Sequence, residues 1–128
     1  MQAGQRYYFE IRILAGNLFK IGVCRKNAPY EKAFSDSLEG WALFNGEMRH
    51  GSNVDGEKLK GLPDKSYSKT EPGDVIGVLV DMIEGKISYS KNGTFLGLAF
   101  EDAEIATGEL YPAVATIKEQ DEFEVSYP

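Results

Sequence analysis

The fold is decided by residues 73–100, whose sequence is GDVIGVLVDMIEGKISYSKNGTFLGLAF. The segment Asp74–Asp81 is nearly continuous apolar sequence rich in β-branched residues, as expected for a central strand that is covered on both faces. Lys86–Ser90 instead alternates, because Ile87 and Tyr89 face one way while serines face the other. The two segments therefore predict neighbouring strands of an antiparallel sheet.

Turn residues divide this stretch into strands that reverse direction. Glu84-Gly85 precedes the alternating segment, and Asn92-Gly93 follows it before a further apolar strand at Phe95–Phe100. An Asn-Gly pair is a strong hairpin signal, because both residues tolerate the positive φ that a tight turn requires. A second pair, Asn45-Gly46, predicts another hairpin earlier in the chain.

Alternating segments outside this stretch predict further strands. Tyr7–Leu14 places its apolar residues on one face, and the turn at Gly16-Asn17 predicts that Leu18–Cys24 returns as its hairpin partner. The chain then has nine or ten short strands and no helix, which an antiparallel β-sandwich buries most simply. The other predicted strands are Gly40–Phe44, Glu47–His50, Leu110–Ile117, Phe123–Tyr127 and, within a loop-rich region, Leu59–Leu62.

Length and composition indicate one soluble domain. The chain has 128 residues, of which 42% are hydrophobic and 27% charged, values typical of a single globular domain. Its single cysteine, Cys24, cannot form an internal disulfide. No signal-peptide pattern is present, and the longest apolar stretch, near Val75–Ile83, is shorter than the ~20 residues of a membrane-spanning helix. We expect an intracellular protein, cytoplasmic or nuclear, with no membrane partner.

Charge is distributed unevenly along the chain. The formal net charge is −6, which argues against general nucleic-acid binding. Residues 1–70 carry 11 basic and 8 acidic side chains, whereas residues 71–128 carry 3 basic and 12 acidic ones. Any basic patch must therefore lie in the first half.

Several short blocks stand in a fixed order along the chain. They are Tyr7–Ile11, Ile21–Val23 followed by Ala28-Pro29, Gly40–Leu43, the stretch 73–100, and Leu110–Val114. In this order the blocks resemble the SPRY domain family, a family of β-sandwich interaction modules, over about residues 7–127. The resemblance implies an all-β fold of two curved antiparallel sheets with a concanavalin-like jelly-roll architecture. It leads us to expect that residues 1–128 are a single SPRY domain excised from a longer protein, lacking the strand that many members carry ahead of Tyr7.

The resemblance also implies where a partner binds. SPRY domains usually contact their partner through loops at one end of the sandwich, which here correspond to Arg25–Ser37, Asn45–Gly56, parts of Leu62–Gly73 and Lys118–Glu122. Aromatic and arginine side chains in such loops are typical of interface hot spots, and Tyr30 and Arg49 are the leading pair. The predicted partner-binding residues are Arg25, Tyr30, Phe34, Arg49, His50, Tyr67 and Lys118.

Some of these residues also have a purely structural interpretation. For Phe34, packing of its own loop onto the core is favoured over ligand contact. Trp41 lies in a strand block where the family places a packing residue, so we expect it in the core. The basic side chains of the first half either form a collar that favours an acidic ligand or are scattered solvated lysines and arginines. They are Arg25, Lys26, Lys32, Arg49, Lys58 and Lys60.

Catalytic and metal-binding signatures are weak. Cys24 and His50 would be the only candidates for a thiol nucleophile and its base, and no local motif supports the pair. Asn53–Glu57 alternates oxygen ligands but lacks the later bidentate glutamate of a calcium loop. Asn92-Gly93-Thr94 matches a glycosylation acceptor, yet its hairpin role explains it. We therefore predict no enzyme activity, no metal and no cofactor.

The best-supported function is non-catalytic recognition of a peptide or exposed loop of another protein. By the resemblance, the domain would be the recognition part of a larger protein, such as a ubiquitin-ligase subunit, an RNA-helicase-like protein or a scaffold. A subgroup of the family recognises an Asn-containing acidic motif. We expect that subgroup to carry an aromatic residue at the Arg49 position and a Trp-Gly pair near Lys118-Glu119, whereas this chain has charged residues there, so that specificity is not transferred. Two alternatives remain open: a nucleic-acid-associated module that uses the basic loops, and a thiol enzyme or small-molecule sensor built on Cys24 and His50.

Overall fold

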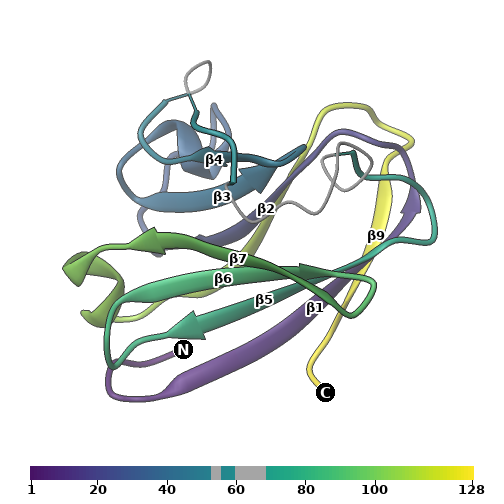
Figure 1. Ribbon diagram of the computed structural model, residues 1–128. Coiled ribbons are helices and arrows are strands. Elements are labelled where there is room, and N and C mark those ends of the chain that lie inside the picture. Colours follow the sequence, from purple (N-terminus) through teal and green to yellow (C-terminus); the bar gives the residue numbers. More distant parts are fainter. Residues whose placement is uncertain (53–55, 60–68) are drawn as a thin grey trace.

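Two antiparallel sheets pack face to face in the computed structural model, which describes residues 1–52, 56–59 and 69–128 (Figure 1). One sheet has five strands in the order β7-β6-β5-β1-β9, and the other has four in the order β4-β3-β2-β8. The all-β sandwich predicted from the sequence is confirmed. The described strands are β1 (Arg6–Ala15), β2 (Phe19–Cys24), β3 (Gly40–Phe44), β4 (Glu47–Arg49), β5 (Val75–Asp81), β6 (Lys86–Lys91), β7 (Thr94–Glu101), β8 (Tyr111–Thr116) and β9 (Glu122–Ser126).

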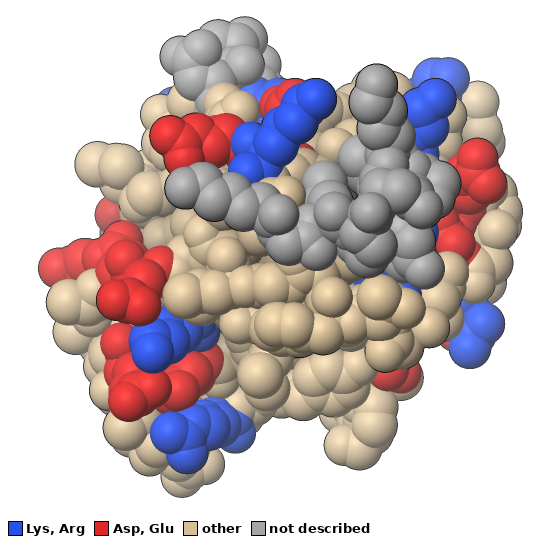
Figure 2. All heavy atoms as spheres, viewed as in Figure 1, with Lys and Arg blue, Asp and Glu red and all other residues tan. Residues whose placement is uncertain are grey.

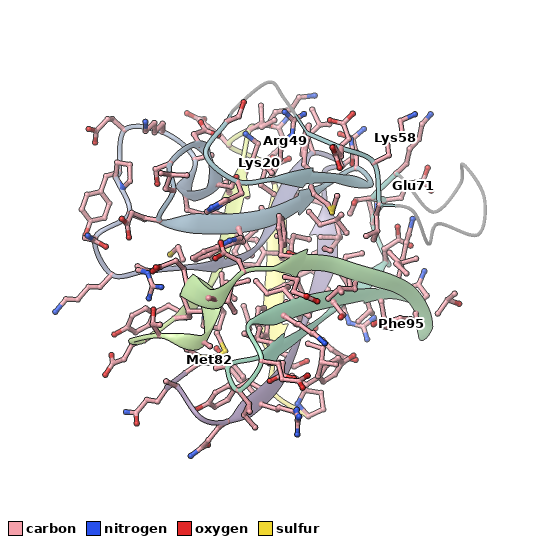
Figure 3. All side chains as sticks on the ribbon, turned by 60° about the vertical axis from the view of Figure 1, so that its left-hand side comes forward. Lys20, Arg49, Lys58, Glu71, Met82 and Phe95 are labelled. Atoms are coloured by element: carbon pink, nitrogen blue, oxygen red, sulfur yellow. The ribbon has the colours of Figure 1, made fainter. Side chains whose placement is uncertain are left out.

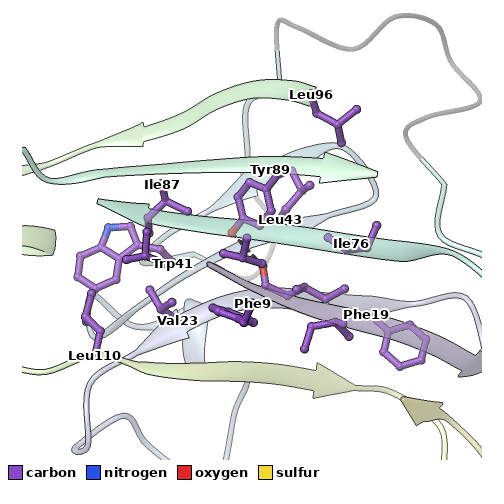
Figure 4. Packing of buried hydrophobic residues seen from close by; sticks show 14 of the residues in the cluster. Phe9, Phe19, Val23, Trp41, Leu43, Ile76, Ile87, Tyr89, Leu96 and Leu110 are labelled. Carbon is purple, nitrogen blue, oxygen red and sulfur yellow. Dashed lines mark hydrogen bonds between the residues drawn. The ribbon is translucent and has the colours of Figure 1, made fainter. Parts of the chain in front are cut away.

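The core lies between the sheets and is formed by alternate residues of the strands. Phe9, Ile11 and Ile13 of β1 are buried, as the period-2 pattern predicted. Tyr89 of β6 crosses the core, where its hydroxyl donates a hydrogen bond to the Ile21 carbonyl of the opposite sheet at 2.9 Å (Figure 4). Burial raises the pKa of Tyr89, so its hydroxyl stays protonated and remains a donor.

The Asn-Gly hairpins are present as predicted. Asn92 and Gly93 have φ values of 51° and 83° between the paired strands β6 and β7. Asn45 and Gly46, with φ values of 48° and 83°, connect β3 and β4 in the same way. Two consecutive residues with positive φ are the signature of the tight hairpin turn whose twist matches that of the strands.

The predicted hairpin between the first two strands is wrong. β1 pairs with β5 and β9, whereas β2 pairs with β3 and β8 in the other sheet. The link through Gly16, at φ 98°, thus carries the chain from one sheet to the other. Two consecutive strands that are each apolar on one face can bury those faces across the core as well as side by side, and here they do so across it.

The expectation that β5 is covered on both faces is also wrong. β5 is the central strand of the five-stranded sheet, as predicted, and Ile76, Val78 and Val80 are buried on its inner side. On its outer side Leu79 is exposed. The predicted strand at Leu59–Leu62 lies mostly outside the described residues; Leu59 itself is buried.

Candidate functional site

The loops that the sequence assigned to one surface lie at two ends of the sandwich. Along β2 and β8, Tyr111 pairs with Cys24 and Thr116 pairs with Phe19. The loop that follows Cys24 therefore begins at one end, and the turn with Lys118 lies at the other. We define the Arg25 end as residues 25–39, 50–52 and 102–110, and the Lys118 end as residues 16–17, 45–46, 69–74 and 117–121.

Trp41 contacts two side chains of the Arg25 end from within the core. It is buried in the core, as predicted. The His50 ring stacks on its indole with centroids 4.7 Å apart and planes 7° apart. The Arg25 guanidinium lies over the same indole, 5.7 Å from its centroid. The structure therefore brings together two predicted site residues, Arg25 and His50, through a third residue that belongs to the core.

Arg25 connects the first loop to the short 3-10 helix η3 (Ala103–Ala106). Its Nη1 donates to the Thr107 carbonyl at 2.9 Å, and its Nη2 donates to the Glu104 carbonyl and to Thr107 Oγ1. Carboxylates of Glu39 and Glu104 lie 3.9 and 3.7 Å from the guanidinium. Because these contacts occupy its donors, Arg25 positions the loop and offers little charge to a ligand.

His50 connects the end of β4 to the same loop. Its Nδ1 lies 2.8 Å from the Gly40 carbonyl, and its Nε2 lies 3.9 Å from the Asp102 carboxylate. The amide of the next residue, Gly51, donates to the carbonyls of Ser35 and Ser37. The first loop is thus held from the β4 side as well as by Arg25.

The middle of the first loop is fixed on the outer face of the four-stranded sheet. Phe34, in the 3-10 helix η1 (Phe34–Asp36), is buried against Gly40, where an added Cβ would come within 2.4 Å of the Phe34 carbonyl oxygen. Asp36 forms an ion pair with Lys20 at 3.1 Å. Phe34 thus has the loop-packing role that the sequence favoured for it.

Two apolar side chains of this fixed loop point into solvent. Tyr30 is 99% exposed and Leu38 is 71% exposed. Tyr30 was predicted as a contact residue, whereas Leu38 was missed because a single leucine in a polar loop carries no periodic signal. Exposed apolar side chains on a loop that the scaffold holds in place make this loop a candidate binding surface.

Arg49 does not stand on this surface. It is 6% exposed, its Nη2 lies 2.7 Å from Glu47 Oε1, and its guanidinium lies over the Phe44 ring. Lys20 approaches the same ring, and Figure 3 shows Lys20 and Arg49 close together in this sheet. Because Arg49 is buried whereas Tyr30 is exposed, the leading pair Tyr30 and Arg49 does not form one exposed feature.

Contacts within the chain engage part of the predicted basic collar. Arg25 and Arg49 both contact the chain's own carboxylates, and Figure 2 shows basic side chains interspersed with acidic ones on the face in view. The two arginines of the basic loops are therefore engaged within the chain, which leaves less free positive charge for the nucleic-acid alternative. Two residues of the prediction, Tyr67 and Lys60, lie outside the described residues.

The Lys118 end is a separate surface. The Asp121 carboxylate accepts hydrogen bonds from the amides of Ile117 and Lys118, which closes the turn and leaves Lys118 exposed. Gly16 packs against this turn, since a Cβ there would lie 2.2 Å from Asp121 Oδ1. A shallow hollow of about 170 Å³ nearby is lined by Asn17, Asn45, Lys69, Thr70 and Glu71.

Cys24 and His50 do not form a catalytic pair. Cys24 follows the inward-facing Val23 and so points to the outer side of its sheet, whereas His50 stacks on the inward-facing Trp41. Burial raises the pKa of the Cys24 thiol, which is the opposite of activation. Within residues 1–52, 56–59 and 69–128, no three His, Cys, Asp or Glu side chains are grouped as metal ligands, and no helix is long and apolar enough to cross a membrane.

Known proteins resemble this chain over nearly its full length. The family model for the SPRY domain matches residues 6–127. The mouse F-box/SPRY domain-containing protein 1 is 28% identical over 110 residues, covering 80% of this chain and 36% of that protein. A Drosophila melanogaster Ran-binding proteins 9/10 homolog is 31% identical over 109 residues, covering 84% of this chain and 11% of that protein.

A solved structure shares the fold. The crystal structure of the SPRY domain of human HERC1 superimposes with a TM-score of 0.69 at 23% sequence identity, covering 96% of this chain and 74% of that one. At this identity the similarity concerns the fold. The relatives found by sequence are longer proteins, and this chain spans less than half the length of each.

Proposed function

The chain belongs to the SPRY domain family, and we propose that it binds a peptide or exposed loop of a partner protein through its Arg25 end. The observation that carries this proposal is the full exposure of Tyr30 on a loop whose other aromatic residue, Phe34, is buried. Leu38 adds a second exposed apolar side chain to the same loop. Exposed tyrosine is a common anchor of protein interfaces because its ring is large, rigid and tolerant of water.

Binding through this loop needs little reorganisation. Arg25 holds its start, the Lys20–Asp36 pair holds its middle, and the Gly51 amide holds the carbonyls of Ser35 and Ser37. A loop already fixed in one conformation loses less entropy when a partner binds. The same contacts leave Tyr30 free to enter a pocket on the partner.

We propose that the preferred partner carries acidic residues beside an apolar one. Lys26 and Lys32 are exposed on either side of Tyr30 and form no ion pair with any residue that the structure describes. Two such ammonium groups favour encounter with carboxylates more than they add to final affinity. Affinity would therefore fall modestly with added salt, while the apolar contacts persist.

The domain would act as the recognition part of a larger intracellular protein. SPRY domains are commonly non-enzymatic interaction modules, and the relatives include an F-box/SPRY protein and a Ran-binding protein homolog. By analogy with the F-box/SPRY protein, the domain would be part of a ubiquitin ligase. By analogy with the Ran-binding protein homolog, it would be part of a scaffold. The geometry of the Arg25 end is compatible with both.

A comparative pull-down tests the proposed surface. The whole chain is immobilised as wild type, as Tyr30→Ala/Leu38→Ala, and as the control Tyr127→Ala/Ile117→Ala. The control also removes one tyrosine and one aliphatic side chain, but from two other exposed positions. We expect proteins retained by the wild type and the control to be lost from the first variant, with equal thermal stability of all three. Loss from the control alone would place the interface elsewhere and reject the proposal.

A further inference from the structure

The outer face of the five-stranded sheet carries an apolar patch that the proposed function does not use. Phe95 is 63% exposed, and Tyr8, Leu79 and Leu98 are each exposed by about two fifths. Figure 2 shows this part of the surface, over β5 to β7, as an area without charged side chains. Apolar side chains gathered on one face of a sheet are typical of an interaction surface.

A shallow hollow of about 100 Å³ lies in the middle of the patch. Small residues, Gly77, Ser88 and Ser90, form its floor, while Tyr8, Leu79 and Phe95 line it. Tyr8 leans over Gly77, because a Cβ at that glycine would lie 2.5 Å from the tyrosine hydroxyl. The hollow can therefore receive an apolar side chain between two aromatic rings.

A row of alternating charges borders the patch at one end. Strand register places Arg6 opposite Asp81, Asp81 opposite Lys86, and Lys86 opposite Glu101. Read across β1, β5, β6 and β7, the row is positive, negative, positive, negative. The Arg6–Asp81 pair is 3.1 Å apart and the Lys86–Glu101 pair is 3.9 Å apart.

When a second copy of this row is turned around and laid over the first, every charge faces one of opposite sign. A two-fold axis parallel to the strands, between β5 and β6, would place Arg6 opposite Glu101 of a second copy and Asp81 opposite its Lys86. The same axis would place Tyr8 opposite Leu98 and close to Phe95, because Tyr8 and Leu98 share a row across the sheet with Leu79 and Ser88. Isologous interfaces require this kind of self-complementarity.

We propose that the outer face of the five-stranded sheet binds a second copy of this chain, related by that two-fold axis. A chain with a net charge of −6 repels its copies, so self-association needs a face whose own charges balance, and the charged row has two of each sign. The arrangement leaves both Arg25 ends pointing the same way. A dimer would thus present two partner-binding surfaces side by side.

The dimer is expected to be weak. The patch spans four strands and three cross-strand rows, roughly 15 by 15 Å from strand and residue spacing. This area, roughly 450 Å² summed over the two copies, is below the range of stable specific interfaces, so the dimer would be a weak, transient one. Such a dimer forms at high local concentration and strengthens binding to repeated partner motifs.

Charge reversal provides a direct test. In Arg6→Glu, residue 6 faces Glu101 of the copy with the same sign, and in Glu101→Lys, residue 101 faces Arg6 with the same sign. Mixing the two variants restores opposite charges at both positions. Sedimentation velocity over about 10 to 500 µM should show wild-type dimerisation, at least about tenfold weaker dimerisation of each variant alone, and recovery in the equimolar mixture.

The mixture distinguishes this proposal from a structural role of the two side chains. Loss of the internal Arg6–Asp81 or Lys86–Glu101 pair would persist after mixing, because each chain keeps its own substitution. Leu79→Glu, which keeps the row but charges the hollow, should abolish dimerisation in any mixture. A wild type that is monomeric throughout this range, or variants that dimerise equally well, would overturn the proposal and leave this face to a different protein.

Discussion

The imidazole of His50 lies flat on the indole of Trp41, with ring centroids 4.7 Å apart. Trp41 is in the core and His50 directly follows the short strand β4, so the stack joins the Arg25 end to the centre of the sandwich. The hydrogen bond between His50 Nδ1 and the Gly40 carbonyl fixes the ring in this orientation. A core residue, Trp41, thus helps to hold the first loop in one conformation.

Replacing His50 should loosen this end. His50→Ala removes both the ring stack and the hydrogen bond and should lower the free energy of unfolding by about 2 kcal/mol. His50→Phe keeps the stack and should recover roughly half of that loss. Urea denaturation measures both free energies of unfolding. Equal stability of the alanine variant and the wild type would show that the stack does not contribute to stability.

The Lys20–Asp36 pair should be costly to break from one side. Both side chains are about nine-tenths buried, so Asp36→Ala leaves the Lys20 ammonium in a poorly solvated position. We expect a loss of about 3 kcal/mol for Asp36→Ala and a smaller loss for the double variant Lys20→Met/Asp36→Ala, which removes both charges of the pair. Thermal unfolding of the two variants gives the comparison; a double variant less stable than Asp36→Ala contradicts this account.

Local patterns explain how much of the fold could be predicted. The Asn92-Gly93 turn and the alternation of Ile87 and Tyr89 depend only on neighbouring residues, and the structure confirms both. The choice of partner for β1 is not local. The sequence around Gly16 is equally compatible with a hairpin and with a crossing between sheets, and only the pairing of β1 with β5 and β9 decides it.

The site was less predictable for the same reason. Arg49 has the residue type of an interface anchor, but Glu47, Phe44 and the returning segment at Gly56 enclose it. Leu38 is exposed beside Gly51 although its type suggests burial. Exposure of a loop residue depends on which distant segment passes over it, and sequence spacing does not contain that information.

Arg25 should influence binding without touching the partner. Arg25→Lys keeps the charge but lacks the planar group that reaches both the Glu104 and Thr107 carbonyls. We expect faster amide hydrogen exchange across residues 25–39, a stability loss of about 1–2 kcal/mol, and weaker capture of proteins bound at Tyr30. Arg12→Lys is the matched control, since Arg12 forms an exposed pair with Glu124 on another face; similar exchange in both variants would reject a positioning role for Arg25.

Asp74 should contribute to the acid sensitivity of the domain. Burial alone would raise the pKa of Asp74, but hydrogen bonds from Asn92 and the Glu71 amide, with the nearby Lys91 ammonium, lower it below its ordinary value. A lowered pKa in the folded state stabilises the fold above the unfolded value of about 3.9, and this contribution is lost as the pH falls through the folded pKa. Unfolding by urea at several pH values should therefore show Asp74→Asn to be less stable than the wild type near neutral pH.

The difference between these two proteins should shrink as the pH falls, because a protonated Asp74 is as neutral as the asparagine that replaces it. The control is Glu124→Gln, which removes an exposed carboxylate whose partner Arg12 is also exposed and should change stability little at any pH. A constant difference between Asp74→Asn and the wild type across the acid range would mean that the turn at residues 71–74 depends on the shape of Asp74 and not on its charge. A difference that vanishes in acid assigns the effect to the carboxylate that connects the start of β5 to Asn92 in the following hairpin.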